Sequence, residues 1–225
     1  MARTMNAHMA FRGVGMTSER TRARMIERLR EQGIKNEQVL MALGLVPRHI
    51  FVEPAMAHRA YEDTALPLIL GQTISQPYIV ARMIELLLEG RASLGKTLEV
   101  GAGCGYQAAV LAQLTREVYG VERLAALLAR ARENLKALRL TRVRLKHGDG
   151  MMGLPEAAPF ESIIVAAAAA AVPQALKDQL TVGGRLVMPV GGGAQMLMVV
   201  ERTAQGWKES LFESVRFVPL LPGVG

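Results

Sequence analysis

The residues best suited to binding chemistry lie in one segment, Glu99-Val100-Gly101-Ala102-Gly103-Cys104-Gly105-Tyr106, which joins a carboxylate to three closely spaced glycines. Glycines such as Gly101 and Gly103 let the backbone turn tightly and approach a ligand. A second carboxylate, Glu122, follows 21 residues after Gly101, where it can accept both hydrogen bonds of a ribose diol. Glu99 would repel a pyrophosphate but suits the cationic amino acid end of S-adenosylmethionine. The pattern favours S-adenosylmethionine as the ligand, with a plain packing turn of an α/β protein as the alternative.

Asp149 and Cys104 are the other candidates for chemistry near these glycines. Asp149 lies in the loop His147-Gly148-Asp149-Gly150, after a predicted strand, where open α/β sheets bind ligands. Its carboxylate could accept a hydrogen bond from an adenine amino group, and the alternative is an Asx turn between glycines. A nucleophilic cysteine needs a nearby base or cation, and none is implied, so we interpret Cys104 as a small filler.

Alternating strands and helices are expected to position these loops at one edge of a sheet. Apolar runs predict strands at 97–100, 118–121, 143–146, 162–165 and 185–189, with helices at 106–114 and 124–138 and after Pro173. This order indicates a doubly wound, Rossmann-like α/β fold, with a mostly parallel sheet and helices on both faces. Strands at 195–201 and 208–215 predict an antiparallel edge near the C-terminus. We expect a flexible leader over 1–15 and a single domain over 16–225.

The N-terminal part of that domain, residues 16–95, is expected to add helices and an active-site loop to the cofactor-binding core of 96–225. Capping residues and apolar periodicity predict one helix over 17–32, a second after Asn36 and a third from Pro77. Residues 47–76 show little periodicity and contain three prolines, which indicates a long, functional loop region.

Composition excludes several classes of protein. Half of the 225 residues are hydrophobic, which excludes wholesale disorder. One cysteine and four scattered histidines offer no metal-ligand spacing, so no metal is expected. The net charge of +7 is mostly arranged at helical spacing, as on solvated helix faces, and so does not predict nucleic-acid binding. The longest apolar run, 163–172, is too short to span a bilayer, and 1–15 lacks a signal peptide's apolar stretch, so we expect a cytoplasmic protein without membrane contact.

A further set of motifs resembles one family over most of the chain, from about Met16 to Gly223. The most specific is Gly71-Gln72-Thr73-Ile74-Ser75-Gln76-Pro77, which general methyltransferases lack. The other matching segments are Val46-Pro47-Arg48, Phe51-Val52, Ala60-Tyr61-Glu62-Asp63, Leu98 to Tyr106, Asp149-Gly150, Gly183 to Pro189 and Val215 to Leu220. Together they resemble the protein-L-isoaspartate (D-aspartate) O-methyltransferases, class I enzymes that use S-adenosylmethionine.

The resemblance implies methyl transfer from S-adenosylmethionine to the free carboxylate of an isoaspartyl residue in a damaged protein, with S-adenosylhomocysteine as the other product. The resulting ester closes to a succinimide, whose hydrolysis returns some normal aspartate. By this resemblance Ser75 is the active-site serine. The cofactor would contact Thr73, Ile74, Ser75, Gln76, Glu99, Gly101, Gly103, Glu122, Asp149 and Gly150, and the substrate would contact Ser75, Val218, Pro219 and Leu220. Partners would be isoaspartyl proteins and peptides, bound by a monomer.

Alternatives remain for both the residues and the function. Without its surrounding segment, Ser75 would be read as a turn or cap serine before the helix at Pro77. The family often has Val-Thr-Ala-Ala-Ala-Pro-Glu where this chain has Val165 followed by Ala166–Ala171, and the effect of this alanine run on substrate binding is open. The alternative functions are methylation of RNA or a small molecule, and a non-catalytic cofactor-binding role. The segment Thr73-Ile74-Ser75 argues against RNA methylation.

Overall fold

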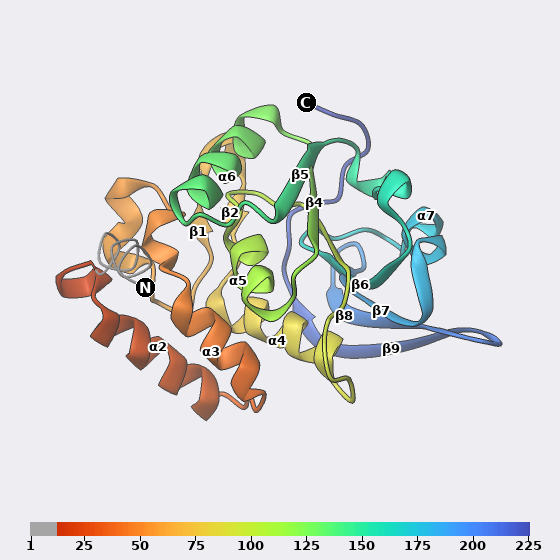
Figure 1. Ribbon diagram of the computed structural model, residues 1–225, viewed down its shortest axis with the longest axis horizontal. Helices are drawn as coiled ribbons and strands as arrows, with labels where there is room; N and C mark the ends of the chain where they lie inside the picture. The colour runs from red at the N-terminus through yellow and green to blue at the C-terminus, as the bar shows by residue number, and fades with distance from the viewer. Residues whose placement is uncertain (1–12) are drawn as a thin grey trace.

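The computed structural model describes residues 13–225 (Figure 1). Residues 1–12 of the predicted leader lie outside this range, and Gly15 is already the first residue of a 3₁₀ turn, Gly15–Thr17. Within the described range, no helix is both long and apolar enough to cross a bilayer.

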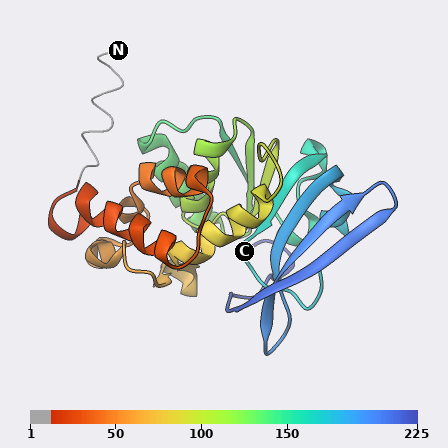
Figure 2. The ribbon, with the colours of Figure 1, turned by 90° about the horizontal axis from the view of Figure 1, so that it is seen from below.

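A seven-stranded sheet runs through this range, in the order β5-β4-β3-β6-β7-β8-β9. In chain order its strands are β3 (Thr97–Val100), β4 (Val118–Glu122), β5 (Val143–His147), β6 (Phe160–Val165), β7 (Leu180–Val190), β8 (Gln195–Thr203) and β9 (Gly206–Val215). The first five strands of that order are parallel, and β8 and β9 pair antiparallel beyond β7. The predicted mostly parallel sheet with an antiparallel edge is confirmed. Figure 2 shows the β8–β9 hairpin projecting on the side away from the N-terminal helices.

Helices cover both faces of this sheet because successive strand side chains point to opposite sides. In β6, Ile164 packs with the layer formed by α4 (Pro77–Leu88), α5 (Tyr106–Leu114) and α6 (Ala125–Ala137). Ile163 and Val165 pack on the other face, with α7 (Gln174–Asp178) and short 3₁₀ turns. The strand β3, which carries Glu99, is buried along its whole length.

Two N-terminal helices form an outer layer against α4 and α5. In α2 (Glu19–Glu31) the side chain of Ser18 caps the first turn, and Met25 and Leu29 are fully buried. In α3 (Glu37–Leu45) the Asn36 side chain accepts hydrogen bonds from the amides of Gln38 and Val39. Both helices begin within two residues of the predicted positions, because a polar capping residue marks each start.

The region 47–76 contains more structure than the sequence suggested. It holds 3₁₀ helices over Arg48–Ile50 and Pro54–Arg59, and a small antiparallel hairpin of β1 (Leu66–Pro67) and β2 (Thr73–Ile74). These elements are too short to show a hydrophobic period, so periodicity did not reveal them. The second strand of this hairpin begins the segment 73–76, which leads directly into α4.

The alanine run Ala166–Ala171 connects two parts of the chain through its backbone. The amide of Ala168 donates a hydrogen bond to the carbonyl of Val218 (2.8 Å), and its carbonyl accepts one from the amide of Leu220 (2.7 Å). Ala169 forms an isolated β-bridge with Val190, the last residue of β7. Ala168 itself is 5% exposed. Small side chains therefore suit Ala167 and Ala168, which are buried, while the backbone of Ala168 holds the segment before the C-terminus.

Candidate active site

A pocket opens at the carboxyl ends of β3, β4 and β6, between the β1–β2 hairpin and the segment that follows β9. This is where the chain order across the sheet reverses, next to β3, and where open α/β sheets bind ligands. The pocket lining includes most of the residues predicted from the sequence, namely Thr73, Ile74, Ser75, Gln76, Glu99, Gly101, Gly103, Glu122, Gly150, Val218, Pro219 and Leu220. Asp149 is not among the lining residues.

The glycine turn between β3 and α5 depends on backbone angles that favour glycine. Gly101, Gly103 and Gly105 have φ values of 83°, 55° and 85°. Gly105 is the N-cap of α5, and a Cβ on it would lie 3.2 Å from the Cβ of Ala131 on α6. Glycine at this position therefore allows the turn and the close packing of two helices together.

Glu122 holds this turn from the end of β4. One carboxylate oxygen accepts the amide of Gly103 (2.8 Å) and the other accepts the amide of Leu124 (2.9 Å), and the side chain is 5% exposed. Each oxygen uses one of its acceptor positions in this way and retains another. The carboxylate is thus fixed at the pocket wall with capacity for two more donors, which fits a ribose diol.

Glu99 differs because one of its oxygens has no partner in the described chain. Oε1 accepts a hydrogen bond from the Gln107 amide (3.1 Å), whereas Oε2 is buried and unpaired. Burial raises the pKa of Glu99 well above its ordinary value, and the negative charge of Glu122 raises it further. A buried, unpaired carboxylate oxygen on a pocket wall is costly unless a cation approaches it. The residues present therefore fit an ammonium-bearing ligand.

Ser75 lines the same pocket and lies between β2 and α4. It is half-buried, and its hydroxyl makes no hydrogen bond within residues 13–225. The N-cap of α4 is Gln76, and the amide of Tyr78 is accepted by Asp63 (2.8 Å), so Ser75 does not cap this helix. The geometry excludes the cap alternative and leaves the hydroxyl available to a ligand.

Asp63 has a structural role that the sequence motif alone did not reveal. Besides capping α4, its carboxylate accepts hydrogen bonds from the side-chain amides of Gln76 (3.3 Å) and Gln32 (2.9 Å). It thereby joins the end of α2, the loop after the 3₁₀ helices and the start of α4. This partner set could not be inferred, because the three segments are far apart in the chain.

The segment Val218–Leu220 is held from two sides. Ala168 binds the carbonyl of Val218 and the amide of Leu220, as described above. The side-chain amide of Gln195, on β8, accepts the amide of Phe217 (2.6 Å) and donates to its carbonyl (3.1 Å). These backbone groups are already in use, so contact between this segment and a peptide substrate would use the remaining carbonyls and the side chains.

Comparison with known proteins places this architecture in one family. A family model described as protein-L-isoaspartate(D-aspartate) O-methyltransferase matches residues 20–224. The chain belongs to the protein-L-isoaspartate (D-aspartate) O-methyltransferase family.

Individual relatives agree with this assignment, and two of them match over nearly their full length. A protein-L-isoaspartate O-methyltransferase of Dechloromonas aromatica is 69% identical over 94% of this chain and 98% of its own. One from Azoarcus sp. is 65% identical, covering 91% of this chain and 94% of its own. A solved protein-L-isoaspartate O-methyltransferase superposes with a TM-score of 0.80 at 26% identity, over 91% of this chain and 67% of that one.

A second solved structure, from Plasmodium falciparum and in complex with S-adenosyl-L-homocysteine, shares the fold. Its TM-score is 0.78 at 24% identity, over 89% of this chain and 98% of that one. The doubly wound, Rossmann-like fold predicted from the order of strands and helices is thus the fold of this methyltransferase family.

Among the site residues expected from the family, Asp149 has both oxygens engaged by the protein. Oδ1 accepts the amide of Met151 (2.8 Å) and Oδ2 accepts the amide of Gly223 (2.7 Å). The Asx-type turn considered from the sequence is therefore present. The neighbouring Gly150 does line the pocket, and a Cβ on it would lie 2.6 Å from Cγ1 of Val100. Contact between Asp149 and adenine stays a prediction.

Behind the glycine turn of this methyltransferase lies a fully buried arginine that sequence reasoning did not single out for a role. Arg48 donates its Nε–H to the carbonyl of Ala60 (2.8 Å), and its guanidinium stacks 4.8 Å from the ring centre of Tyr106. Both Nη atoms lack a hydrogen-bond partner in the described chain.

Cys104, within the glycine turn, is buried as well. Burial raises the pKa of its thiol to about 11, so the thiol is neutral at ordinary pH and fits its predicted role as filler.

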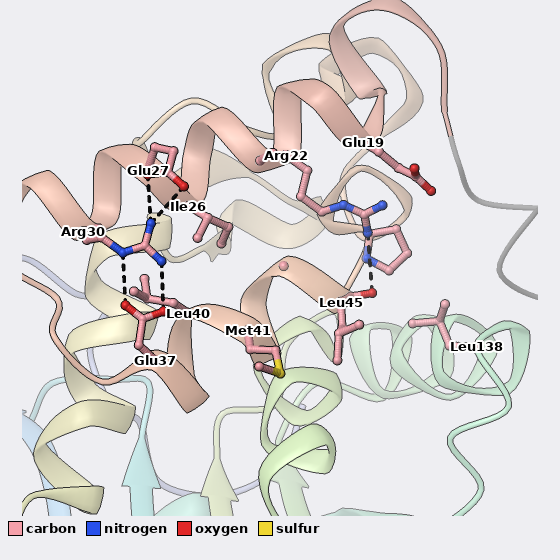
Figure 3. A pocket seen from close by; sticks show the side chains of 13 residues that line it. Glu19, Arg22, Ile26, Glu27, Arg30, Glu37, Leu40, Met41, Leu45 and Leu138 are labelled. Atoms are coloured by element: carbon pink, nitrogen blue, oxygen red, sulfur yellow. Dashed lines mark hydrogen bonds and ion pairs between the residues drawn. The ribbon is translucent and has the colours of Figure 1, made fainter.

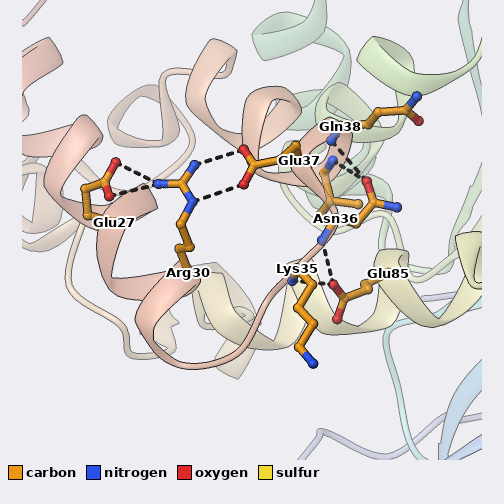
Figure 4. Close-up of polar contacts among 8 residues, drawn as sticks. Glu27, Arg30, Lys35, Asn36, Glu37, Gln38 and Glu85 are labelled. Atoms are coloured by element: carbon orange, nitrogen blue, oxygen red, sulfur yellow. Dashed lines mark hydrogen bonds and ion pairs between the residues drawn. The ribbon is translucent and has the colours of Figure 1, made fainter.

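A second cavity lies between α2 and α3 and shares no lining residue with the first pocket (Figure 3). Its wall combines apolar side chains such as Ile26 and Met41 with a charged cluster of Glu27, Arg30 and Glu37, which Figure 4 shows among its neighbours. In that cluster Arg30 pairs with Glu27 (2.8 Å) and Glu37 (2.9 Å). Residues 13–225 contain no grouping of histidine, cysteine and acidic side chains that could hold a metal ion.

Proposed function

We propose that the pocket at the strand ends transfers the methyl group of S-adenosylmethionine to the free carboxylate of L-isoaspartyl and D-aspartyl residues in damaged proteins. The observation that carries this proposal is the division of unpaired polar groups within one pocket. Glu99, with one unpaired buried oxygen, lines the pocket from β3, and the free hydroxyl of Ser75 lines it from the segment between β2 and α4. A cationic methyl donor and an anionic acceptor would therefore be bound by different elements of the chain.

On the donor side, Glu99 would bind the ammonium group and Glu122 the ribose hydroxyls. The glycines would admit the ligand close to the backbone, and Gly150 would border the adenine. Bound there, S-adenosylmethionine supplies a methyl group activated by its sulfonium. The segment 73–76 would line the region where donor and acceptor meet.

On the acceptor side, the Ser75 hydroxyl would donate a hydrogen bond to the isoaspartyl carboxylate and fix its direction. One carboxylate oxygen forms the new bond to the methyl carbon as the carbon–sulfur bond breaks, which gives a methyl ester and S-adenosylhomocysteine. A carboxylate is already nucleophilic at neutral pH, so the protein needs no general base. Its contribution is orientation and exclusion of water. A neutral donor suits this task, since a cation bound to the acceptor would weaken its attack.

We also propose that the enzyme acts as a cytoplasmic monomer on proteins and peptides rather than on nucleic acid. The residues expected to bind donor and acceptor, Asp149 excepted, meet in one pocket of this chain. Val218, Pro219 and Leu220 would contact the peptide next to the isoaspartyl residue.

The decisive experiment is transfer of a radiolabelled methyl group. The acceptors are an isoaspartyl peptide, the same peptide with normal aspartate, and bulk RNA. We expect label in the isoaspartyl peptide only, in a base-labile ester. Label in RNA, or equal label in the two peptides, would contradict the proposal.

A further inference from the structure

Arg216 lines the mouth of the pocket and is not used by the protein itself. Its side chain is exposed, and it makes no ion pair or hydrogen bond within the part of the chain that the structure describes. It lies just after β9, two residues before Val218. A cation without a partner at the entrance of a binding site is available to a ligand.

The other charged residues of this lining are either suited to the donor or paired within the protein. Glu99 and Glu122 lie at the ends of β3 and β4 and fit the donor. Arg123 follows Glu122 directly and donates its Nε–H to the carbonyl of Gly223 (3.4 Å). Charge in the pocket is therefore divided, with carboxylates toward the donor and the free cation Arg216 on the segment expected to contact the substrate.

The backbone on either side of Arg216 is fixed, although its guanidinium is free. Val215 pairs with Gln195 in the β8–β9 register, and the Gln195 side chain binds both backbone groups of Phe217. The base of the arginine side chain thus has a defined position, while its long, flexible end reaches into solvent at the pocket mouth. This arrangement suits a contact with a group beside the acceptor rather than with the acceptor.

We infer that Arg216 is a specificity-determining residue that favours isoaspartyl substrates with an aspartate or glutamate side chain next to the isoaspartyl residue. The inference rests on the proposed function. Because the contact is exposed to water, each acidic neighbour should lower KM about two- to fivefold, the size of a solvent-exposed ion pair. Salt should reduce the preference, and kcat should be unaffected because the reacting atoms are not touched.

The test uses blocked isoaspartyl peptides that differ only in the neighbouring residues, which are glutamate, glutamine or lysine on the N-terminal or the C-terminal side. The full chain is compared with R216Q, R216K and R216E, and R24Q is a control with the same change of charge on the exposed face of α2. Wild type, R24Q and R216K should prefer a glutamate peptide through KM, and high salt should weaken this preference. R216Q should not discriminate among the peptides, and R216E should favour the lysine peptide.

The outcomes separate this inference from the proposed function. If wild type fails to methylate the glutamine peptide, the proposed function is wrong. If wild type methylates all peptides but R216Q keeps the same preference, Arg216 does not read the neighbouring charge. If R216Q lowers kcat equally for every peptide while its thermal melt is unchanged, Arg216 contacts the acceptor itself, and the inference is overturned.

Discussion

Two of the cavities in the described part of the chain, the α2–α3 cavity and the pocket at the strand ends, differ in how their charged residues are paired. In the α2–α3 cavity Arg30 lies between Glu27 and Glu37, all three are largely exposed, and each charge has a partner (Figure 4). In the pocket at the strand ends, Glu99 is fully buried with one oxygen unpaired. The Ser75 hydroxyl is likewise without a hydrogen bond in the described chain. The three charges Glu27, Arg30 and Glu37 of the first cavity are thus paired with one another, whereas the second pocket requires a ligand to satisfy its polar groups.

The difference shows that unpaired polar groups identify a binding site better than the presence of charges does. Exposed ion pairs are screened by water and contribute little to stability. A buried carboxylate without a partner costs free energy, and a protein retains it where binding compensates for that cost. Substitutions in the two cavities should therefore have effects of very different size.

The largest expected effect is that of Ser75→Ala. Loss of one positioned donor should lower kcat/KM for an isoaspartyl peptide on the order of ten- to a thousandfold, with cofactor affinity nearly unchanged. The free energy of unfolding should change by less than about 0.5 kcal/mol, because the hydroxyl has no partner to lose. Steady-state kinetics and thermal melts of the same preparations measure both quantities. The exposed Ser93→Ala serves as the control, and full activity in Ser75→Ala would refute the assignment.

Glu122→Ala should have the next largest effect, on cofactor affinity. Removal of a carboxylate that binds the ribose should weaken binding of S-adenosylhomocysteine by about 1.5–3 kcal/mol, the usual range for hydrogen bonds to a charged group. Calorimetric titration measures this, with Glu133→Ala on the exposed surface of α6 as control. An unchanged dissociation constant in a folded variant would remove Glu122 from the site.

Glu99→Gln should weaken binding of the ammonium-bearing ligand on the order of tenfold at neutral pH, since the amide keeps a hydrogen-bond acceptor but loses the charge. Burial raises the pKa of Glu99, and only the ionised form attracts the ligand. Wild-type affinity should therefore rise as the pH increases from 5 to 7, while that of the variant stays flat. The same slope in both proteins would show that another group controls the pH dependence.

The stability of Glu99→Gln should change in the opposite direction. Below pH 4.5, the ordinary pKa of this carboxyl, the group is neutral in both the folded and the unfolded chain. Above it the unfolded chain ionises while the buried group resists ionisation, so the wild type loses stability until the pH passes the raised folded pKa. The ligand-free variant should therefore have the higher melting temperature at pH 7, and the advantage should vanish near pH 4. Equal melting temperatures of the two proteins at both pH values would contradict a raised pKa of Glu99 in the folded chain.

The smallest effect should come from Arg30→Gln in the α2–α3 cavity. Its partners are exposed, so water replaces the lost ion pairs. We expect unchanged cofactor affinity and kcat/KM, and a slightly lower melting temperature whose difference from wild type disappears in high salt. A loss of activity comparable to that of Ser75→Ala would mean that this cavity takes part in the reaction.

The sequence was informative wherever a local rule determines structure. Apolar periodicity, together with a capping residue or the proline at position 77, located α2, α3 and α4, and the glycine turn indicated the edge of the sheet where a ligand binds. The short β1–β2 hairpin and the three partners of Asp63 depend on contacts between distant segments, so no local pattern contains them. For the same reason the buried position of Arg48 and the clamp of Gln195 on Phe217 emerged only from the structure.

The hydrogen bonds of Asp63 bear on whether methyl transfer or cofactor binding is lost first when the protein begins to unfold. One carboxylate secures the start of α4, beside Ser75, and also receives a hydrogen bond from Gln32 beyond the end of α2. Partial undocking of the outer helices would release the acceptor side of the pocket while β3, β4 and the glycine turn keep their own contacts. In mild denaturant, methyl transfer should therefore fail before affinity for S-adenosylhomocysteine does.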